Sequence, residues 1–323
     1  MALRLHAGLG RGEVLDGAGR AREMLPELFR AGRPLVCVMA LGIVVRLLGP
    51  HLRAKQQEPP VVVVDEAGRF AVSVLGGHQA GGNDLTREVA HALGAAPVVT
   101  TASDVLGLPA VDLVGQSWGW RIAPDSDLTQ VAAAVVRGEP VAVWQECGRS
   151  DWWTEWGDWP ATFQRVASEP GEGWAAALII TDRCCRPAAC PRVIYRPPSL
   201  VLGVGCRRGV CGDDIEEAFQ RVCQRHGWAA ESLGLVATAT LKAGEPGLRD
   251  FVARHGVELR CFTLEELAAV GNLPTPSETV RRHIGVGGVA EPAAMLAAGT
   301  AELVVPKQIC KGVTVALARR TEV

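Results

Sequence analysis

His78 is the residue whose neighbours give it the best opportunity for acid–base chemistry, because it stands inside a glycine-rich turn. Gly76, Gly77, Gly81 and Gly82 flank it and remove side chains where the backbone must bend or approach a ligand closely. The scarcity of packing partners so near an imidazole favours a functional role over a structural one. A helix pattern follows, and the N–H groups of its first turn predict a site for an acidic ligand.

The helix expected after this turn is recognised from apolar residues at a spacing of four, namely Leu85, Val89 and Leu93. Asn83 and Asp84 stand before them, and both residue types accept hydrogen bonds from the N–H groups at a helix start. We therefore expect Asn83 and Asp84 to cap this helix beside the acidic-ligand site.

A second glycine turn occurs in GVGCRRGVCGDD, residues 203–214, between a strand pattern and a helix pattern. Arg207 and Arg208 at the start of that helix predict a clamp for carboxylates. A dinucleotide-binding fold needs an acidic residue at the end of the next strand, but that strand ends in Lys242. Arg208 also occupies the place of the third glycine, so the pattern disfavours binding of a nicotinamide dinucleotide.

A third glycine turn, in GVGGVAEPAAML at residues 285–296, contains Gly287 and leads into another helix pattern. Glu291 falls in the first turn, where an acid commonly complements the helix dipole. Beside an anion site the same residue could act as a general acid or base, and both interpretations stay open. Lys307 follows an expected strand, where ligands of α/β proteins gather, although a solvated surface lysine is the commoner case.

Strand and helix patterns alternate along the chain, which predicts an α/β fold. In the N-terminal part, strands are expected over 34–39, 60–65, 70–75 and 96–101, and helices over 18–30 and 43–53. The strands 60–65 and 70–75 are expected to pair as a hairpin across a tight turn at 66–69. In the C-terminal part, strands are expected over 198–206, 235–241, 257–262, 303–306 and 313–318, and helices over 213–226, 247–255, 277–283 and 289–298. A further helix is expected after the strand 257–262, with Thr263 as its cap. Polar residues follow the strand 96–101, which ends in Thr100 and Thr101, with Asp104 just beyond.

The predicted architecture is therefore an N-terminal and a C-terminal α/β sheet domain joined by a smaller α/β middle domain. The expected boundaries are 1–112, 113–197 and 198–323. The middle segment differs in composition, because seven of the nine tryptophans fall between Trp118 and Trp159. Such rings could bind a planar ligand, but packing in a small core is the favoured interpretation.

Composition narrows the classes of function. The formal net charge of −2 and the scattered basic residues give no indication of nucleic-acid binding. The longest nearly apolar run, residues 34–45, is too short to span a bilayer, and no secretory signal is recognisable, so a cytoplasmic protein is expected. The ten cysteines are expected to be reduced and form no zinc-like spacing, while a redox role for Cys206 and Cys211 is only weakly indicated.

Taken together, several segments resemble the CbiG family of anaerobic cobalamin biosynthesis. The segments that carry the resemblance are VMALGIVVRLLGP (38–50), residues 61–104, SLVLGVGCRRG (199–209), LKAGEPGL (241–248) and residues 276–307. Three departures are evident: the part before residue 33 is short, the tryptophan-rich middle is unusual, and the turn that commonly reads GH-x-GGAN has Ala80 and Gly82 at two of its places.

The resemblance implies a cobalt-tetrapyrrole substrate, a ring-contracted corrinoid that carries a δ-lactone. Water opens the lactone, and the extruded carbon leaves with its methyl group as acetaldehyde. A base must deprotonate water, and a donor must hold the oxyanion. The cobalt-bearing macrocycle can accept the electrons of the broken C–C bond, so no protein-held metal, nicotinamide or other cofactor is expected.

Under this interpretation His78 or Glu291 is the base, and the other residue positions water. The acidic groups of the substrate need cations and helix N-termini. The expected substrate-binding residues are Gly76, Gly77, Gly81, Asn83, Thr100, Thr101, Asp104, Arg207, Arg208, Gly287 and Lys307.

Three other classes stay open. A non-catalytic carrier of corrinoid intermediates would bind the tetrapyrrole and release no acetaldehyde. A dinucleotide-dependent reductase would use the turn at residues 203–209, and an interaction module would use the tryptophan-rich segment. No membrane or nucleic-acid partner is expected, while a homodimer and transient contacts with other corrin-pathway enzymes stay open.

Overall fold

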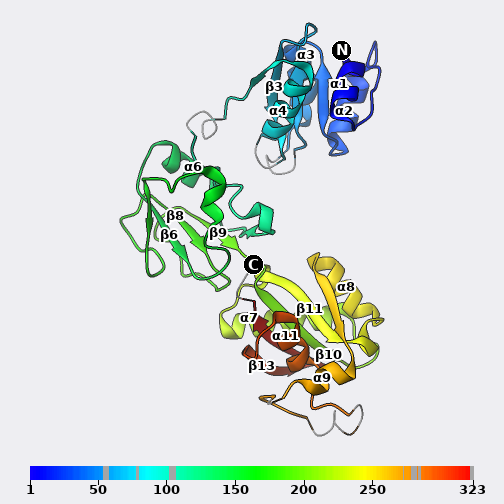
Figure 1. Ribbon diagram of the computed structural model, residues 1–323, viewed down its shortest axis with the longest axis vertical. Coiled ribbons are helices and arrows are strands. Elements are labelled where there is room, and N and C mark those ends of the chain that lie inside the picture. The colour runs from blue at the N-terminus through cyan, green and yellow to red at the C-terminus, as the bar shows by residue number, and fades with distance from the viewer. Residues whose placement is uncertain are drawn as a thin grey trace. The chain divides into compact units, whose positions relative to one another are not determined.

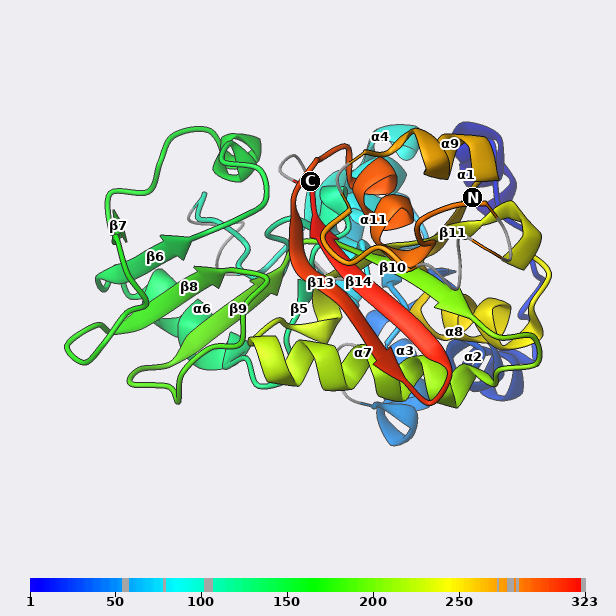
Figure 2. The same cartoon turned by 90° about the horizontal axis from the view of Figure 1, so that it is seen from below.

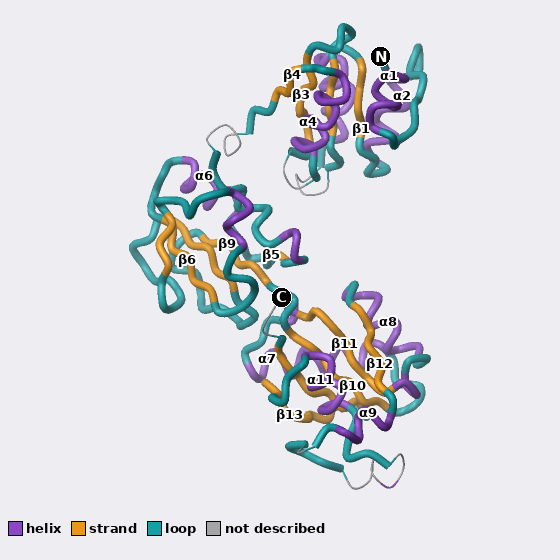
Figure 3. Tube along the Cα trace, in the orientation of Figure 1, coloured by secondary structure: helices purple, strands orange, loops and turns teal. Residues whose placement is uncertain are grey.

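The structure is a computed structural model, and it describes residues 1–53, 58–77, 80–101, 107–271, 273–277, 282 and 285–320. The chain divides into a first unit, Met1–Leu113, and a second unit, Val114–Val323 (Figure 1). In the described residues the first unit contains a four-stranded sheet and the second contains two five-stranded sheets. Helices are interspersed with the strands (Figure 3), which confirms the α/β class.

The sheet of the first unit has the strand order β1-β2-β3-β4. Its strands are β1 (Leu35–Val38), β2 (Val61–Val64), β3 (Phe70–Leu75) and β4 (Ala96–Val98). The predicted hairpin is confirmed, because β2 and β3 pair antiparallel, while β1 is parallel to β2 and β3 is parallel to β4. The carboxyl ends of β3 and β4 therefore lie at one edge of this sheet, opposite the carboxyl ends of β1 and β2.

Helices cover both faces of this sheet. One face packs against α2 (Ala21–Arg30) and α3 (Leu41–Leu48), which is followed by the short 3₁₀ helix η1 (Gly49–His51). The other face packs against α1 (Ala2–Leu9) and α4 (Gly82–Leu93). The four valines of β2 are all buried, as expected for a central strand covered on both faces.

The capping prediction for α4 is wrong. The helix begins at Gly82 and its N-cap is Gly81, whose positive φ of 77° suits glycine, so Asn83 and Asp84 lie inside the first turn. Among the described residues, no side chain caps the helix. The backbone N–H groups of Gly82 and Asn83 instead donate to the carbonyls of Gly76 and Gly77, at 2.9 and 3.0 Å. The glycine turn itself supplies the acceptors that a capping side chain would provide.

The middle sheet has the order β5-β9-β8-β6-β7 and is parallel except for β5. Its elements are η3 (Gln116–Trp118), β5 (Arg121–Ile122), α6 (Leu128–Val136), β6 (Val141–Gln145), η4 (Trp152–Trp156), β7 (Phe163–Arg165), β8 (Ala176–Ile180) and β9 (Arg192–Arg196). Trp120 and Trp152 are buried, and the Trp152 and Trp153 rings meet Trp159 edge-on at 5.9 and 5.8 Å. These tryptophans pack against one another, which agrees with the core interpretation.

The C-terminal sheet has the order β12-β11-β10-β14-β13. Its strands are β10 (Leu200–Cys206), β11 (Leu233–Ala239), β12 (Glu258–Phe262), β13 (Leu303–Cys310) and β14 (Val313–Arg319). β10, β11 and β12 are parallel, whereas β14 runs antiparallel to β10 and pairs with β13 as a hairpin. The carboxyl ends of β10 and β11 thus lie next to each other at one edge.

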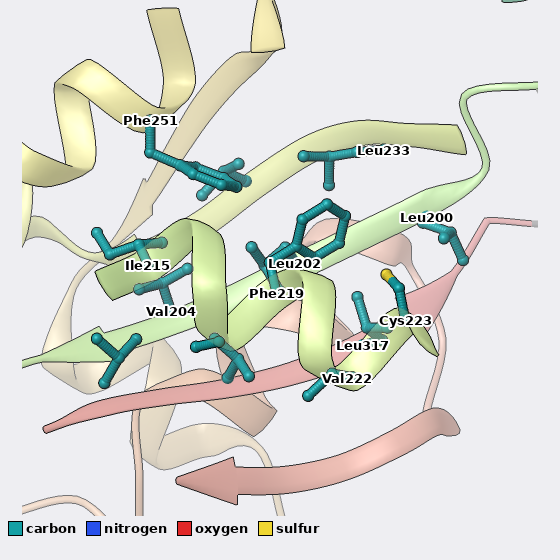
Figure 4. Close-up of a cluster of buried hydrophobic side chains, with 14 of the residues drawn as sticks. Leu200, Leu202, Val204, Ile215, Phe219, Val222, Cys223, Leu233, Phe251 and Leu317 are labelled. Atoms are coloured by element: carbon teal, nitrogen blue, oxygen red, sulfur yellow. The ribbon is translucent and has the colours of Figure 1, made fainter. Parts of the chain in front are cut away.

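Helices lie on both faces of this sheet as well. The 15-residue α7 (Gly212–His226) and α8 (Pro246–His255) pack on one face, where Phe219, Phe251 and Leu202 meet (Figure 4). Figure 2 shows α7 extending along the β10, β14 and β13 side. The opposite face carries α9 (Leu264–Ala269) and α11 (Ala290–Ala298), and Thr263 caps α9 with a capping box to Glu266, as its position predicts. The 3₁₀ turns η5 (Ala230–Ser232) and η6 (Thr240–Lys242) flank β11.

An ion pair with a fully buried carboxylate joins the middle sheet to the C-terminal sheet within the second unit. Asp182, just after β8, is fully buried and accepts hydrogen bonds from Arg319 Nε at 2.7 Å and from a terminal nitrogen of the same guanidinium at 3.0 Å. The Ser199 hydroxyl donates to the same carboxylate at 2.6 Å. Such a two-pronged contact fixes direction as well as distance.

Among the helices that the structure describes, none has the length and apolar character to cross a membrane.

Candidate functional site

The glycine turn of the first unit is closed by backbone contacts that tolerate no side chain. A Cβ on Gly76 would lie 2.7 Å from Pro60 Cα, and the φ of Gly76 is +69°. A Cβ on Gly82 would lie 2.8 Å from the carbonyl oxygen of Leu75. These glycines are therefore required by the close approach of the backbone to itself. His78, the predicted base, lies outside the described residues, immediately after Gly77.

Asn83 is the polar centre of this turn, and 2% of its surface is exposed. Its Oδ1 accepts a hydrogen bond from Ser73 Oγ at 2.8 Å, and its Nδ2 donates to Thr101 Oγ1 at 3.1 Å. A Cβ on Gly77 would lie 3.5 Å from Asn83 Oδ1 and 3.7 Å from Thr101 Oγ1. The structure thus brings Gly77, Asn83 and Thr101 together, and Asn83 connects β3, α4 and the segment after β4.

Two other predicted residues of this edge have different surroundings. Thr100 is exposed, and β4 ends at Val98, so Thr100 follows the strand and is not part of it. Asp104 lies outside the described residues. The partly buried Thr101 is therefore the threonine that the structure places in the turn.

The second glycine turn lies at the carboxyl end of β10. Arg207 and Arg208 are exposed there, and the Arg207 backbone N–H donates to the carbonyl of Gly312 at 3.3 Å. Neither arginine forms an ion pair within the part of the chain that the structure describes. Gly203, earlier in β10, allows α11 to pack closely on the strand. A Cβ there would lie 1.9 Å from the carbonyl oxygen of Ala290 in α11.

Sequence reasoning missed two residues that meet this turn, Lys242 and Glu245. One carboxylate oxygen of Glu245 accepts the Gly209 N–H at 3.1 Å, and the other accepts Lys242 Nζ at 3.0 Å. The Gly209 N–H and then the Lys242 ammonium hold the pKa of Glu245 below its ordinary value. LKAGEPGL contains both residues, but no spacing rule links Glu245 to a glycine 36 residues earlier.

Glu291 lies in the first turn of α11 and is buried, with 3% of its surface exposed. Its Oε1 accepts hydrogen bonds from Thr275 Oγ1 at 2.6 Å and from the Lys307 backbone N–H at 3.0 Å. Its Oε2 accepts the Thr275 backbone N–H at 3.2 Å. The Lys307 ammonium in turn donates to the Thr275 carbonyl. Glu291, Thr275 and Lys307 therefore form one polar cluster, and the dipole interpretation alone does not account for it.

The predicted place of Lys307 at a strand end is wrong. β13 continues to Cys310, and Lys307 lies inside it, where the pairing with β14 shifts register between Val305 and Gln308. The irregularity turns the Lys307 N–H away from the ladder and toward Glu291, as bulges commonly re-aim a residue. Gly287 also joins this region, because its carbonyl accepts the Ser277 N–H at 2.7 Å. Most of the helix expected over 277–283 lies outside the described residues.

A cavity in the first unit lies away from all these residues. It has a volume of about 480 Å³ and is lined by Met39, Ala40, Leu41, Val63, Asp65, Glu66, Phe70, Val72 and Val98. Several of these residues belong to the carboxyl ends of β1 and β2, the edge opposite Gly76 and Asn83. None of the predicted site residues that the structure describes lines it.

Neither the thiols nor the potential metal ligands that the structure describes form a second site. Burial raises the pKa of Cys37 to about 11 and the pKa values of Cys147 and Cys223 to about 12, so these thiols stay protonated at neutral pH. Burial also raises the pKa of Cys206, which disfavours the weakly indicated redox role. In the described ranges, His, Cys, Asp and Glu side chains form no group of three or more that could hold a metal ion.

Comparisons with known proteins cover the chain in three consecutive parts. The family models match "Cobalamin synthesis G N-terminal" at residues 23–104, "Cobalamin biosynthesis central region" at 109–197 and "Cobalamin synthesis G C-terminus" at 200–318.

Relatives and a solved structure are similar to this chain over different spans. A protein of Priestia megaterium named cobalt-precorrin-5A hydrolase is 37% identical over 308 residues, which cover 93% of this chain and 82% of that protein. One of Salmonella typhimurium with the same name is 32% identical and covers 84% of this chain and 77% of that protein. A crystal structure of cobalamin biosynthesis protein chiG from Agrobacterium tumefaciens is 33% identical, with a TM-score of 0.30, and covers 38% of this chain and 98% of that one.

Proposed function

The chain belongs to the CbiG family of cobalamin-synthesis proteins, and from this premise we propose that it is a cobalt-precorrin-5A hydrolase. The observation that supports the activity most directly is the similarity to two proteins of that name at 37% and 32% identity over most of the chain. The match includes all three sheets, so the proposal concerns the whole chain.

The reaction that we propose has two steps and consumes one water. Water adds to the lactone carbonyl, and the C–O bond breaks to give a carboxylate and an alcohol. The alcohol then loses its proton, its carbon–oxygen bond becomes a carbonyl, and the C–C bond to the macrocycle breaks, which releases acetaldehyde. The electron pair of that bond passes into the conjugated cobalt macrocycle. Because the substrate brings its own electron acceptor and its own cobalt, the proposal needs no protein-held cofactor.

The charges at the carboxyl edge of the C-terminal sheet support binding of an acidic substrate. Arg207, Arg208 and Lys242 lie on the two loops that follow β10 and β11. The Glu245 carboxylate joins these loops through the Gly209 N–H and the Lys242 ammonium. Guanidinium groups bind carboxylates with two parallel hydrogen bonds. We therefore assign the acetate and propionate groups of the substrate to this edge.

For the base we favour His78 over Glu291. Both oxygens of Glu291 already accept hydrogen bonds from Thr275 and Lys307, so its carboxylate is committed to protein groups. His78 follows Gly77 in the sequence, and Gly77 lies beside the Asn83–Thr101 hydrogen bond in a turn built from glycines. In this assignment His78 takes the proton of water, and Glu291 holds the Thr275 segment and β13 in place.

Replacing each candidate base, His78 and Glu291, by itself tests this assignment. H78A is expected to lower kcat for acetaldehyde release by about 10²–10⁴-fold, the range for loss of a general base. Thermal unfolding of H78A should match the wild type, whereas E291Q should unfold more easily. A fully active and folded H78A would exclude His78 as the base.

The second candidate function is a carrier that binds the corrinoid and does not convert it. This alternative is favoured by the hydrogen bonds that occupy Glu291, because they leave His78 as the single candidate for the base that catalysis requires. We further propose a cytoplasmic location, a homodimer and contacts with neighbouring pathway enzymes. Sedimentation tests the homodimer, and pull-down from cell extract tests the contacts with other enzymes.

A further inference from the structure

Glu245 occupies an unusual position at the start of α8. It is the N-cap residue of that helix, yet its carboxylate makes no capping hydrogen bond with the helix. It instead contacts the Gly209 N–H and the Lys242 ammonium, and 12% of its side chain is exposed. The side chain thus contacts a loop from another part of the chain and not the start of its own helix.

The two loops that Glu245 joins follow neighbouring parallel strands. β10 and β11 pair in register from Leu202 with Val236 to Gly203 with Ala237. The Gly209 loop follows β10, and η6, which ends at Lys242, follows β11. Ligands of open α/β sheets bind outside the carboxyl ends of such strands, so Glu245 fixes two loops at the edge where a ligand is expected.

The loop that Glu245 fixes presents two exposed cationic side chains. Arg207 and Arg208 are exposed and form no ion pair with any described residue. Gly209, the next residue, has a φ of +78°, so the loop depends on a left-handed glycine at the point where Glu245 contacts it. Loss of that contact would free the backbone directly after the two arginines.

We propose that Glu245 is a positioning residue for the acidic substrate, which holds the Gly209 loop so that Arg207 and Arg208 form a carboxylate clamp with Lys242 as a third cation. The inference rests on the proposed function for the identity of the substrate. Glu245 does not touch the reacting atoms; it acts through the loop.

Steady-state kinetics with cobalt-precorrin-5A separate this role from a purely structural one. E245A is expected to raise KM by about tenfold with kcat within about twofold of the wild type, because ground-state binding is weakened and the chemistry is not. E245Q, which keeps an oxygen for the Gly209 N–H, should recover part of the loss. E139Q is the matched control, because Glu139 forms an exposed ion pair with Arg137 beside the middle sheet and belongs to neither loop.

A cycle of variants tests whether Glu245 acts through the arginines. If it does, adding E245A to an R207A/R208A variant should raise KM by less than about twofold, since the clamp is already lost. An E245A variant with the KM of the wild type, or a fully multiplicative effect in the triple variant, would overturn the proposal.

Failure of the proposed function is distinguishable from failure of this inference. Binding of the cobalt-corrinoid can be followed by the change in its visible absorbance, which needs no turnover. If no variant and no wild-type protein releases acetaldehyde, but E245A binds the cobalt-corrinoid more weakly, the hydrolase is rejected and the positioning role is supported. If E245A and E245Q turn over and bind the substrate as the wild type does, the hydrolase is supported and the positioning role is rejected.

Discussion

The backbone N–H of Lys307 donates a 3.0 Å hydrogen bond to Oε1 of Glu291, although the residues lie on a strand and a helix 16 positions apart. The same oxygen accepts the Thr275 hydroxyl at 2.6 Å. One buried carboxylate therefore ties together α11, β13 and the segment around Thr275. Because a buried acceptor of three hydrogen bonds is costly to replace, Glu291 is the residue on which this corner of the sheet most depends.

Replacement of Glu291 should lower stability before it affects chemistry. In E291Q the amide N–H₂ must face a donor, either the Thr275 N–H or the Thr275 hydroxyl and Lys307 N–H. The unfolding free energy is therefore expected to fall by about 1–3 kcal/mol. Urea unfolding measures this loss. E302Q, at an exposed glutamate nearby, should change the unfolding free energy by less than about 0.5 kcal/mol. Equal stability of E291Q and wild type would show that the three contacts are dispensable.

Asn83 should be the corresponding residue of the first unit. N83A removes the hydrogen bonds to Ser73 and Thr101 and leaves both hydroxyls to find other partners. A loss of about 1–3 kcal/mol is expected from these buried contacts. D84N in the next position, exposed and paired only on the surface with Arg87, is the control and should be nearly neutral. Hydrogen exchange of the α4 amides would reveal the loosening, and unchanged protection in N83A would contradict the prediction.

The Asp182–Arg319 pair should hold the middle and C-terminal sheets together. D182N leaves the Arg319 guanidinium without its anion, and breaking such a pair from the buried side costs about 3–5 kcal/mol. Because 30% of the Arg319 side chain is exposed, the lower end of this range is expected. D151N breaks the exposed Arg149–Asp151 pair and should cost less than about 1 kcal/mol. Similar unfolding midpoints for the two variants would exclude a special role for Asp182.

The Glu245 contacts imply a defined pH dependence. The folded protein holds the pKa of Glu245 below the value of an unfolded glutamate, so its contribution to stability is fully present above the unfolded pKa. That contribution is lost as the pH falls through the lower pKa of the folded state. The difference in unfolding free energy between wild type and E245Q should therefore be constant near neutral pH and shrink in acid. A difference that grows toward low pH would have the wrong sign.

The sequence could predict what depends on local pattern. Alternation of strands and helices, the hairpin at 60–75 and the Thr263 cap all follow from near neighbours, and the structure confirms them. The glycine turns were also recognisable, because a run of glycines before a helix has few other uses.

Long-range contacts explain where prediction failed. Asn83 has a typical capping residue type, but Gly76 and Gly77 supply backbone carbonyls that satisfy the helix start, and the side chain connects distant strands instead. Lys307 was expected after a strand, but an irregular register keeps it inside β13. Glu245 meets Gly209 only because β10 and β11 are neighbours, which sheet order and not spacing decides.

The measurement that tests the central proposal most directly is an anaerobic incubation of the purified protein with cobalt-precorrin-5A and an assay for acetaldehyde. The account predicts that acetaldehyde appears in step with the loss of substrate, and that H78A slows its release by about 10²–10⁴-fold while the cobalt-corrinoid still binds. Tight binding of the substrate by the wild-type protein with no acetaldehyde released would contradict the hydrolase and favour the carrier.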